Sequence, residues 1–359
     1  MSIHFHKLKI KDIRKETDDC ISISFDVPEE LRDTFIFQHG QNITLKLDLH
    51  GQETRRSYSI CTSPFDNDLR VAVKKVEGGV FSAFAHSTLK AGDEVEVLPP
   101  TGRFNTILHP GHTKKYLAFA AGSGITPVMS IIKTVLQTEP GSSFTLVYGN
   151  RNRHSIIFFE ELEALKNKYL QRLNLIYVLS REGTDTSIHA GRIDQQKLSE
   201  LSRLINYATM DEIFICGPEE MIFAVKDFLD ALKIDSKKIH FELFTTPGQK
   251  KNPLSVSAES QKTSDKSHVT VKLDGRTMEF DLAPDSDDTI LDAAIKLGAD
   301  LPYSCRGGVC CTCKAKLTEG KVEMEMNWGL EEEEVEQGYI LTCQSHPRSA
   351  NIVVDFDVK

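Results

Sequence analysis

Along the first 105 residues, apolar and polar positions alternate. The alternation is clearest in short runs that Gly and Pro separate: "CISISFDV", "QNITLKLDL", "LRVAVKKV" and "DEVEVLPP". A period of two residues is typical of strands that bury one face and expose the other. This part of the chain therefore predicts an antiparallel β-barrel or sandwich.

From about residue 114 the pattern changes. Continuous apolar runs appear, namely "KYLAFAA", "SFTLVYG", "LNLIYVLS" and "EIFICG". Segments of helical period lie between them, including "TPVMSIIKTVLQ", "FFEELEALKNKY" and "EEMIFAVKDFLDALK". Strands buried on both faces read as continuous apolar runs, and their alternation with helices predicts an α/β domain with a parallel sheet.

A third pattern begins at residue 245, where the chain becomes rich in Ser, Lys and Gly and loses any sustained period. This composition predicts a flexible linker over residues 245–267, with a span of about 25 Å for about 20 residues of random coil. A hairpin-like pair of short strands and the helical segment "DDTILDAAIKLGA" follow. We therefore expect three domains in series, over residues 1–108, 109–244 and 268–359.

Composition agrees with a globular protein, at 40% hydrophobic and 26% charged residues. The sequence lacks an apolar run of about 18 residues and its first residues are too polar for a signal peptide, so we expect a cytoplasmic protein. The net charge of −9 lies entirely in residues 268–359, which hold 18 acidic and 9 basic residues. This acidic module favours either a basic partner surface or simple solubility, and nucleic acid is a poor partner because no segment concentrates positive charge.

Five of the eight cysteines lie after residue 300. Cys305, Cys310 and Cys313 have the spacing C-x4-C-x2-C, and Cys343 follows at a distance. This is the spacing of plant-type [2Fe–2S] ligands, so the four cysteines predict such a cluster and leave Cys311 as a non-ligand.

Other interpretations of the cysteines are weaker. A zinc site would need two C-x2-C pairs or matched histidines, but one pair exists and His346 stands alone. A group of unligated structural cysteines is a third interpretation. Gly307 and Gly308 favour the cluster, because they allow the backbone to wrap closely around it.

The motifs "PYSCRGGVCCTC" and "LTCQ" resemble those of plant-type ferredoxins. The resemblance covers about the last 90 residues. It implies an α+β domain with the β-grasp fold and a cluster near one exposed end.

Two motifs in the first domain are candidate binding sites. "RRSYSI", from residue 55, follows a predicted strand, although an exposed strand with a solvated Arg would have the same letters. About twenty residues later, Gly78 and Gly79 precede a predicted helix that begins near Ser82. A glycine turn that leads into a helix N-terminus favours the binding of an anion.

Together, R-x-Y-S and G-x-x-S in an antiparallel barrel resemble the flavin domain of the ferredoxin–NADP reductase family. The resemblance implies FAD, with Tyr58 packed on the isoalloxazine ring, Ser59 near its N5 atom and Arg56 paired with the pyrophosphate. It also assigns the pyrophosphate to the backbone of the glycine turn: Gly79, Val80, Phe81 and Ser82.

"AAGSGITP" and "ICGPEEM" both lie where a predicted strand leads into a helix. Glycines at such junctions let the backbone approach a phosphate, although they also serve tight packing alone. In the same family these segments bind NADP(H), with Cys216 near the nicotinamide. The other residues that the resemblance assigns to this coenzyme are Gly122, Gly124, Thr126, Gly217 and Pro218.

Coenzyme choice is predicted from the ends of two strands. "VLSRE" places Ser180 and Arg181 after a strand, and an Arg there suits the 2′-phosphate of NADPH, whereas an acidic residue would favour NADH. Asn150 and Arg151, in "YGNR", end the preceding strand. We therefore expect NADPH rather than NADH.

"FELF" ends the reductase portion of the chain and matches the terminal Glu-x-aromatic of the family. The resemblance places Glu242 near the flavin or nicotinamide and Phe244 over the flavin ring. A buried strand with an edge Glu is the plainer interpretation. Ser59, Cys216 and Glu242 are thus the residues that we expect next to the reacting atoms.

The order of flavin, NADP and ferredoxin domains resembles the reductase components of multicomponent oxygenases. It implies an NAD(P)H-dependent oxidoreductase that passes electrons from NADPH to FAD, to the cluster and then to a terminal oxygenase, here a di-iron enzyme acting on phenylacetyl-CoA. Reductases of ketosteroid hydroxylases, Rieske oxygenases and hybrid-cluster proteins share this layout, and a diaphorase feeding a ferredoxin pool is another alternative. A non-enzymatic redox sensor is disfavoured because R-x-Y-S and C-G-P are both present.

Overall fold

The computed structural model describes residues 4–49, 51–244 and 266–358. The larger of two compact units contains residues 5–54 and 58–244, and the smaller one is built on residues 266–358. The linker predicted over residues 245–267 lies outside the described residues except at its end, where Ser267 already belongs to a strand.

The first part of the larger unit is a six-stranded antiparallel sheet in the order β4-β3-β6-β1-β2-β5. A bridge between Ile60, just after β4, and Val71 of β5 joins the two edges, so the sheet closes as a barrel. Its elements are β1 (His6–Thr17), β2 (Cys20–Asp26), β3 (Asn42–Leu49), β4 (Gln52–Ser59), β5 (Leu69–Lys74), α1 (Val80–Ser87) and β6 (Glu94–Val97).

The alternating pattern in the sequence explains this barrel, because one face of each strand enters a shared core. Ile43 and Leu45 of β3 and Leu8 of β1 are fully buried there. Helix α1 closes the core with Phe81, which is 1% exposed. The prediction of an antiparallel β-barrel is therefore confirmed.

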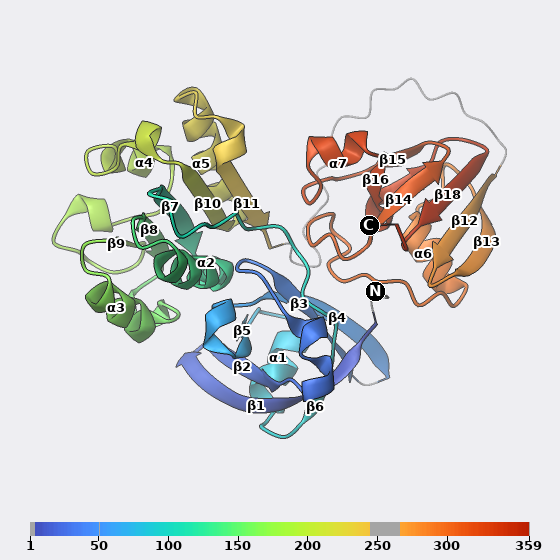
Figure 1. Cartoon of the computed structure of the whole chain (residues 1–359), viewed down its shortest axis with the longest axis horizontal. Helices are drawn as coiled ribbons and strands as arrows, with labels where there is room; N and C mark the ends of the chain where they lie inside the picture. Colours follow the sequence, from blue (N-terminus) through green and yellow to red (C-terminus); the bar gives the residue numbers. More distant parts are fainter. Residues whose placement is uncertain (1–3, 50, 245–265, 359) are drawn as a thin grey trace. The chain divides into compact units, whose positions relative to one another are not determined.

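The second part of the larger unit is a parallel five-stranded sheet in the order β11-β10-β7-β8-β9. Helices α2 and α3 cover one face and α4 and α5 cover the other (Figure 1). Its elements are β7 (Lys115–Ala121), α2 (Ile125–Thr138), β8 (Ser143–Asn150), α3 (Phe159–Lys168), β9 (Leu173–Leu179), α4 (Gln195–Leu201), β10 (Glu212–Gly217), α5 (Glu219–Ala231) and β11 (Ile239–Leu243).

The strand order places β7 beside β10, although β8 and β9 lie between them in the sequence. The chain leaves β7 toward one side of the sheet and β10 toward the other, so their carboxyl ends flank a crevice. Ligands of open α/β sheets bind at such switch points. Both glycine motifs of the predicted nucleotide site, which follow β7 and β10, therefore lie at the same edge.

The smaller unit contains a mixed sheet in the order β13-β12-β18-β14-β16 and a two-stranded sheet of β15 and β17. Helix α6 packs on the mixed sheet through Ile290, Leu291 and Ala294, so this is the predicted α+β domain. Its elements are β12 (Ser267–Leu273), β13 (Arg276–Leu282), α6 (Ile290–Lys296), β14 (Lys314–Glu319), β15 (Val322–Met324), α7 (Glu332–Glu336), β16 (Tyr339–Leu341), β17 (Ser345–Pro347) and β18 (Asn351–Asp355).

Two local expectations differ from the structure. The motif "RRSYSI" was expected after a strand, but residues 55–59 form the second half of β4 itself. The helix expected to open near Ser82 begins at Val80, because Gly79 takes an extended conformation and caps it. Within the described ranges, no helix is both long enough and apolar enough to cross a membrane.

Candidate functional site

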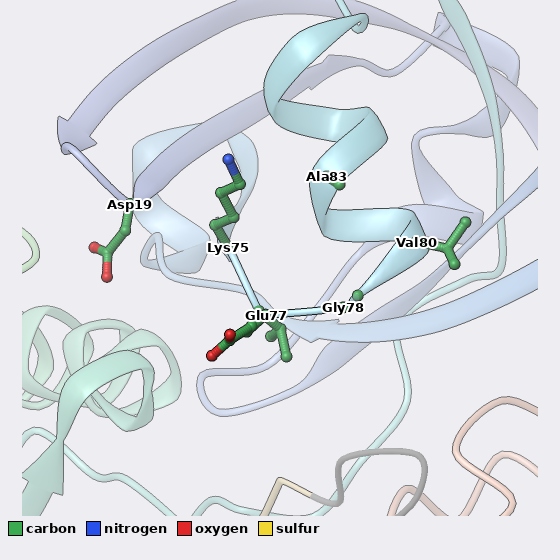
Figure 2. Close-up of a pocket in the computed structure, with 8 residues that line it drawn as sticks. Asp19, Lys75, Glu77, Gly78, Val80 and Ala83 are labelled. Atoms are coloured by element: carbon green, nitrogen blue, oxygen red, sulfur yellow. The ribbon is translucent and has the colours of Figure 1, made fainter.

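The N-terminus of α1 opens into a hollow of about 600 Å³ on the flavin barrel (Figure 2). The first N–H groups of a helix have no partner within it, so they are available to an anion. The residues that line the hollow are Asp19, Lys75, Val76, Glu77, Gly78, Gly79, Val80 and Ala83.

Ser82 holds the glycine turn together. Its hydroxyl accepts a hydrogen bond from the Val76 N–H at 3.1 Å and donates one to the Gly79 carbonyl at 3.2 Å. A Cβ on Gly79 would lie 2.7 Å from this hydroxyl, so the turn requires glycine there. The Ser82 hydroxyl is thus engaged within the turn, and the N–H groups of the first helical turn remain as the donors that fit a pyrophosphate.

Lys75 lies in this hollow and was missed by the sequence reasoning. Figure 2 shows its side chain pointing away from that of Glu77. The signal was present as two consecutive lysines just before the glycine turn. Lys75, the second of these lysines, is therefore a candidate cation for the phosphates, since a positive charge beside a helix N-terminus strengthens anion binding.

The end of β4 brings Tyr58 and Ser59 to the site. Tyr58 is partly buried, and its ring centroid lies 5.5 Å from that of Phe81 on α1. Ser59 is buried, and its hydroxyl lies 3.2 Å from Oε2 of Glu242 on β11. Residues 183 positions apart in the sequence thus meet at one point.

Glu242 also lies opposite Cys216 in the parallel pairing of β11 with β10. Burial raises the pKa of Glu242 to about 7, and the Ser59 hydroxyl opposes this rise by donating to the carboxylate. Burial also raises the pKa of the Cys216 thiol well above its usual range, and the nearby Glu242 adds to this rise. This corner can therefore hold a proton on a carboxyl group near neutral pH, beside a neutral thiol.

The turn after β7 is held by close backbone contacts. A Cβ on Gly124 would lie 2.0 Å from the Cys216 carbonyl oxygen, so this glycine lets the turn press against β10. Gly122 has a φ of +54° and its carbonyl accepts a hydrogen bond from the Tyr148 hydroxyl at 2.9 Å. The Thr126 hydroxyl donates to the Ser123 carbonyl at 3.0 Å.

The two glycines of this turn therefore have different roles. Gly124 serves packing against β10, whereas Gly122 lies at the open edge, where a Cβ would be 3.6 Å from the Lys74 ammonium. Gly217 and Pro218 continue from β10 into α5, with Pro218 as the residue that caps the helix. The glycine turns at the ends of β7 and β10 therefore lie together at the switch point, where open α/β sheets bind their ligands.

Four of the predicted coenzyme residues lie side by side at the ends of β8 and β9. The Ser180 N–H donates to the Asn150 carbonyl at 2.9 Å, and the Arg181 N–H donates to the Arg151 carbonyl at 2.8 Å. Both arginine side chains are exposed. Within the described residues, the buried Asn150 Nδ2 is one of the side-chain atoms without a hydrogen-bond partner, so it fits a donor to a bound ligand.

An acidic residue adjoins this arginine pair. The Glu182 carboxylate accepts a hydrogen bond from the Arg153 N–H at 2.6 Å. This hydrogen bond joins the Glu182 carboxylate to the backbone of Arg153 rather than to the side chain of Arg151 or Arg181. The two exposed arginines offer guanidinium groups of the kind that bind phosphate.

The four predicted cluster ligands group in two pairs. The neighbouring Cys305 raises the pKa of the Cys310 thiol, and the neighbouring Cys343 raises that of the Cys313 thiol. No group of three or more His, Cys, Asp or Glu side chains in the described ranges could hold a single metal ion. Two pairs are the donor arrangement that a two-iron cluster needs, since four thiolates serve two irons.

The loop around Cys305 directs N–H groups at sulfur. The Cys305 sulfur accepts hydrogen bonds from the N–H groups of Gly307 at 3.3 Å and Cys310 at 3.4 Å. The Cys310 thiol and these N–H groups outweigh burial and lower the pKa of Cys305 to about 6. Such bonds favour a thiolate, the form that binds iron.

The backbone of this loop differs in detail from the prediction. Gly308 has a φ of +74°, as expected of a residue that gives freedom, but Gly307 does not take a left-handed conformation and instead donates to sulfur. Arg306 and Cys311 take the left-handed conformation at +51° and +55°. The Cys311 thiol donates to the Gly329 carbonyl at 2.8 Å, so it is committed outside the two pairs.

Arg56 and Phe244 are the two remaining residues that were predicted to contact the flavin. Arg56 lies on β4 and donates to the Arg55 carbonyl at 2.7 Å. Phe244 follows β11 and is 38% exposed. Their contacts to a flavin stay predictions.

Three protein-family models match the chain in the order that the sequence predicted. The Oxidoreductase FAD-binding domain matches residues 7–106, the Oxidoreductase NAD-binding domain matches residues 119–227, and the 2Fe-2S iron-sulfur cluster binding domain matches residues 271–348. The chain therefore binds FAD, a pyridine nucleotide and a [2Fe–2S] cluster.

Similar proteins extend over the whole chain. One of the components of 1,2-phenylacetyl-CoA epoxidase from Escherichia coli K12 is 47% identical over 99% of this chain and 98% of its own length. The ferredoxin reductase component of 3-ketosteroid-9-alpha-monooxygenase from Rhodococcus rhodochrous is 36% identical over 97% and 96%. The reductase subunit of glycine betaine monooxygenase from Pseudomonas aeruginosa is 32% identical over 98% and 95%.

Solved structures share the fold. Phthalate dioxygenase reductase aligns with a TM-score of 0.60 and 24% identity, over 98% of both chains. An intact type IV self-sufficient cytochrome P450 monooxygenase aligns with a TM-score of 0.71 and 21% identity, over 98% of this chain and 41% of its own. The three cofactor-binding domains and the three relatives named above, which match the chain over nearly its full length, lead to one conclusion: the chain belongs to the family of oxygenase reductase components.

Proposed function

We propose that this reductase draws electrons from NADPH and delivers them to the oxygenase component of a phenylacetyl-CoA epoxidase. The observation that carries the proposal is the identity of 47% to a component of that enzyme over nearly the full length of both chains. The ketosteroid and glycine betaine monooxygenase reductases named above are 36% and 32% identical. A ketosteroid or glycine betaine monooxygenase partner is therefore the weaker alternative.

The bound cofactors supply the redox chemistry: the pyridine nucleotide gives hydride, FAD accepts it, and the cluster passes on single electrons. The protein binds, orients and shields them. The N-terminus of α1 and Lys75 hold the flavin pyrophosphate, and Tyr58 supports the ring. Arg56 is assigned to the same pyrophosphate and Phe244 to the ring face.

The proposed catalytic corner consists of Ser59, Cys216 and Glu242. Because the pKa of Glu242 is raised to about 7, its carboxyl group can hold a proton that the Ser59 hydroxyl orients. The buried, neutral Cys216 thiol excludes water from the end of β10. The proposed cluster ligands are Cys305, Cys310, Cys313 and Cys343.

The preference for NADPH rests on Arg181, with Arg151 beside it at the ends of neighbouring strands. Replacing Arg181 by Gln removes a charge that only NADPH can use, through its 2′-phosphate. We expect R181Q to lower kcat/KM for NADPH by roughly tenfold or more and to leave that for NADH within about twofold. The exposed control R32Q keeps the wild-type ratio. An R181Q variant with an unchanged NADPH to NADH ratio would exclude this assignment.

Reconstitution tests the acceptor. The purified reductase is mixed with the oxygenase component of phenylacetyl-CoA epoxidase, or with that of ketosteroid or glycine betaine monooxygenase, and NADPH-dependent product is measured. We expect the epoxide of phenylacetyl-CoA to form fastest. Equal or faster product formation with another oxygenase at equal concentration would refute the proposed partner.

We also propose that the protein works in the cytoplasm. None of the eight cysteines, all of which lie in the described residues, forms a disulfide, as a reducing compartment permits. Cell fractionation with an antibody to the chain tests this, and recovery in the periplasmic fraction would refute it.

A further inference from the structure

One face of α2 is tied to the flavin barrel by three polar side chains. Ser130, Lys133 and Thr134 stand at positions i, i+3 and i+4, so they share a face of the helix. Opposite them runs the segment 62–66, which is separated from the end of β4 by two residues. All of these residues belong to the larger unit.

The contacts are short and protected from water. The Ser130 hydroxyl donates to the Thr62 carbonyl at 2.6 Å, and the Thr134 hydroxyl lies 3.1 Å from that of Ser63. Both hydroxyl groups are buried. The Thr134 hydroxyl also donates to the Ser130 carbonyl at 2.6 Å within α2, so it stays satisfied without Ser63. Breaking the bond from Ser130 to the Thr62 carbonyl would instead leave two buried partners unsatisfied, which is costly.

Lys133 adds an ion-pair bridge at the rim of this contact. Its ammonium lies 2.5 Å from Asp66 in the segment and 2.7 Å from Glu161 on α3. Its side chain is 16% exposed, so solvent screens these pairs less than pairs in open water. The bridge therefore joins α3, α2 and the flavin barrel.

The segment 62–66 is itself stiff. The Ser63 N–H donates to Asp66 at 2.8 Å, and the Ser63 hydroxyl accepts from the Phe65 N–H at 3.3 Å, which makes a capping box. A displacement of α2 is thus transmitted to the end of β4, where Tyr58 and Ser59 lie, rather than absorbed by a loose loop.

The opposite end of α2 carries the nucleotide turn. That end is fixed by the approach of Gly124 to the Cys216 carbonyl and by the bond from Tyr148 to the Gly122 carbonyl. The same helix therefore contacts the nucleotide turn at its N-terminus and the flavin strand along its side. Reacting atoms must lie about 3–3.5 Å apart for fast transfer, and a misplacement of about 1 Å can slow it roughly 100-fold.

We infer that Ser130, Lys133 and Thr134 are positioning residues that set the pyridine nucleotide against the flavin. The inference rests on the proposed reduction of FAD by pyridine nucleotide and is independent of the acceptor protein. These residues contact neither predicted cofactor site, so they act through the rigid connection of α2 to the segment 62–66. Loosening that connection misaligns the nucleotide without abolishing its binding.

The double variant Ser130→Ala/Thr134→Val tests the buried contacts in the FAD-loaded chain. Stopped-flow mixing with NADPH gives the limiting rate of flavin reduction and the apparent Kd. We expect the limiting rate to fall by about tenfold, with the apparent Kd within about twofold and the FAD content unchanged. Such a split separates misalignment from lost binding or unfolding.

The matched control is Thr138→Val on the same helix. Among the described residues, the Thr138 hydroxyl is a buried group without a hydrogen-bond partner, so the same substitution removes no contact to the flavin barrel. We expect T138V to keep the wild-type rate within about twofold.

Lys133 offers a second test with a conservative rescue. K133M breaks the bridge, whereas K133R keeps a cation that can reach both carboxylates. We expect K133M to slow flavin reduction several-fold and to speed hydrogen–deuterium exchange in the segment 62–66, and K133R to restore both. The exposed control K15M, which breaks the Lys15–Asp18 pair, changes neither.

Three outcomes would overturn the inference. The double variant could reduce its flavin at the wild-type rate, T138V could slow it equally, or K133M could leave both rate and exchange unchanged. Failure of the wild-type chain to be reduced by NADPH or NADH would instead refute the proposed function, and with it any positioning role.

Discussion

Glu242 has a raised pKa that its position in the sequence does not predict. The motif "FELF" predicts a strand with a functional Glu, but the raised pKa arises from burial at the end of β11. The counteracting hydroxyl comes from Ser59, far away in the sequence. Only the folded chain brings the two together.

The raised pKa has a direct consequence for pH dependence. The folded chain holds this proton up to about pH 7, whereas the unfolded chain releases it near 4.5, so the contribution of Glu242 to stability falls as the pH rises from about 4.5 to 7. Infrared difference spectra should show a protonated carboxyl band that disappears with a midpoint near pH 7. E242Q should lack this band, and S59A should move its midpoint upward, because the hydroxyl that lowers the pKa is gone.

The exposed control E160Q should keep the band. A band that persists in E242Q would mean that another carboxyl group carries the proton. A midpoint that stays in place in S59A would mean that the hydroxyl does not reach the carboxylate.

The cysteines allow a similarly sharp comparison. Cys343 pairs with Cys313, whereas the Cys311 thiol is bonded to the Gly329 carbonyl. We expect C343S to lose the visible absorption of the cluster and most of its iron and acid-labile sulfide, and C311S to retain both in full. Loss of iron in C311S together with retention in C343S would reverse the ligand assignment.

At the scale of elements, the first residue of β10 anchors the parallel sheet. Glu212 accepts hydrogen bonds from Lys114, just before β7, at 2.6 Å and from His240 of β11 at 2.8 Å. Burial alone would raise the pKa of Glu212, but His240 and Lys114 outweigh it and lower the pKa to about 2. The carboxylate thus stabilises three adjacent strands at the amino end of the sheet.

The sign of this shift sets the expected effect of E212Q. A carboxylate with a lowered pKa stabilises the fold above its unfolded pKa of about 4.5 and loses that effect as the pH falls toward 2. We expect E212Q to cost roughly 2 to 3 kcal/mol at pH 7 and progressively less below pH 4.5. Urea unfolding of the larger unit, followed by release of FAD at several pH values, measures this.

The control for that measurement is E29Q. Glu29 forms an exposed pair with Arg32 at 3.9 Å, and such pairs contribute little. An E212Q variant as stable as E29Q at pH 7, or one whose deficit grows in acid, would contradict the sign and size of this effect.

The elements themselves were largely predictable. Apolar runs predicted β7, β8 and β10, because these strands are buried on both faces of the parallel sheet. A similar run predicted β9, although this edge strand is only partly buried. β4 was less visible, since residues 52–59 are mostly polar and its second half carries the flavin motif. Residues 52–59 therefore lack the alternating apolar and polar pattern on which strand prediction depends.

The site was predictable where chemistry depends on spacing and unpredictable where it depends on tertiary contact. The cysteine spacing indicated four ligands, but their grouping into pairs requires the fold of the loop and of the turn at Thr342–Gln344. The role of Gly124 in packing against Cys216, and the place of Lys75 beside α1, likewise follow from elements far apart in sequence.

At the scale of the whole molecule, one polypeptide unites a two-electron and a one-electron cofactor. The flavin and nucleotide sites lie in the larger unit, and the four paired cysteines lie in the smaller one. The acidic excess is confined to residues 268–359. A chain organised in this way suits transfer to a separate partner protein, as in the relatives that are components of oxygenases.

The central claim is that this chain accepts electrons in pairs and passes them on singly through its iron–sulfur cluster. An anaerobic titration with NADPH, followed by visible absorption, tests it most directly. We expect bleaching of both flavin and cluster bands, complete at about 1.5 equivalents per wild-type chain and about 1 equivalent for C343S, because FAD takes two electrons and the cluster takes one. A wild-type chain that stops at one equivalent, with its cluster bands unchanged, would contradict the account.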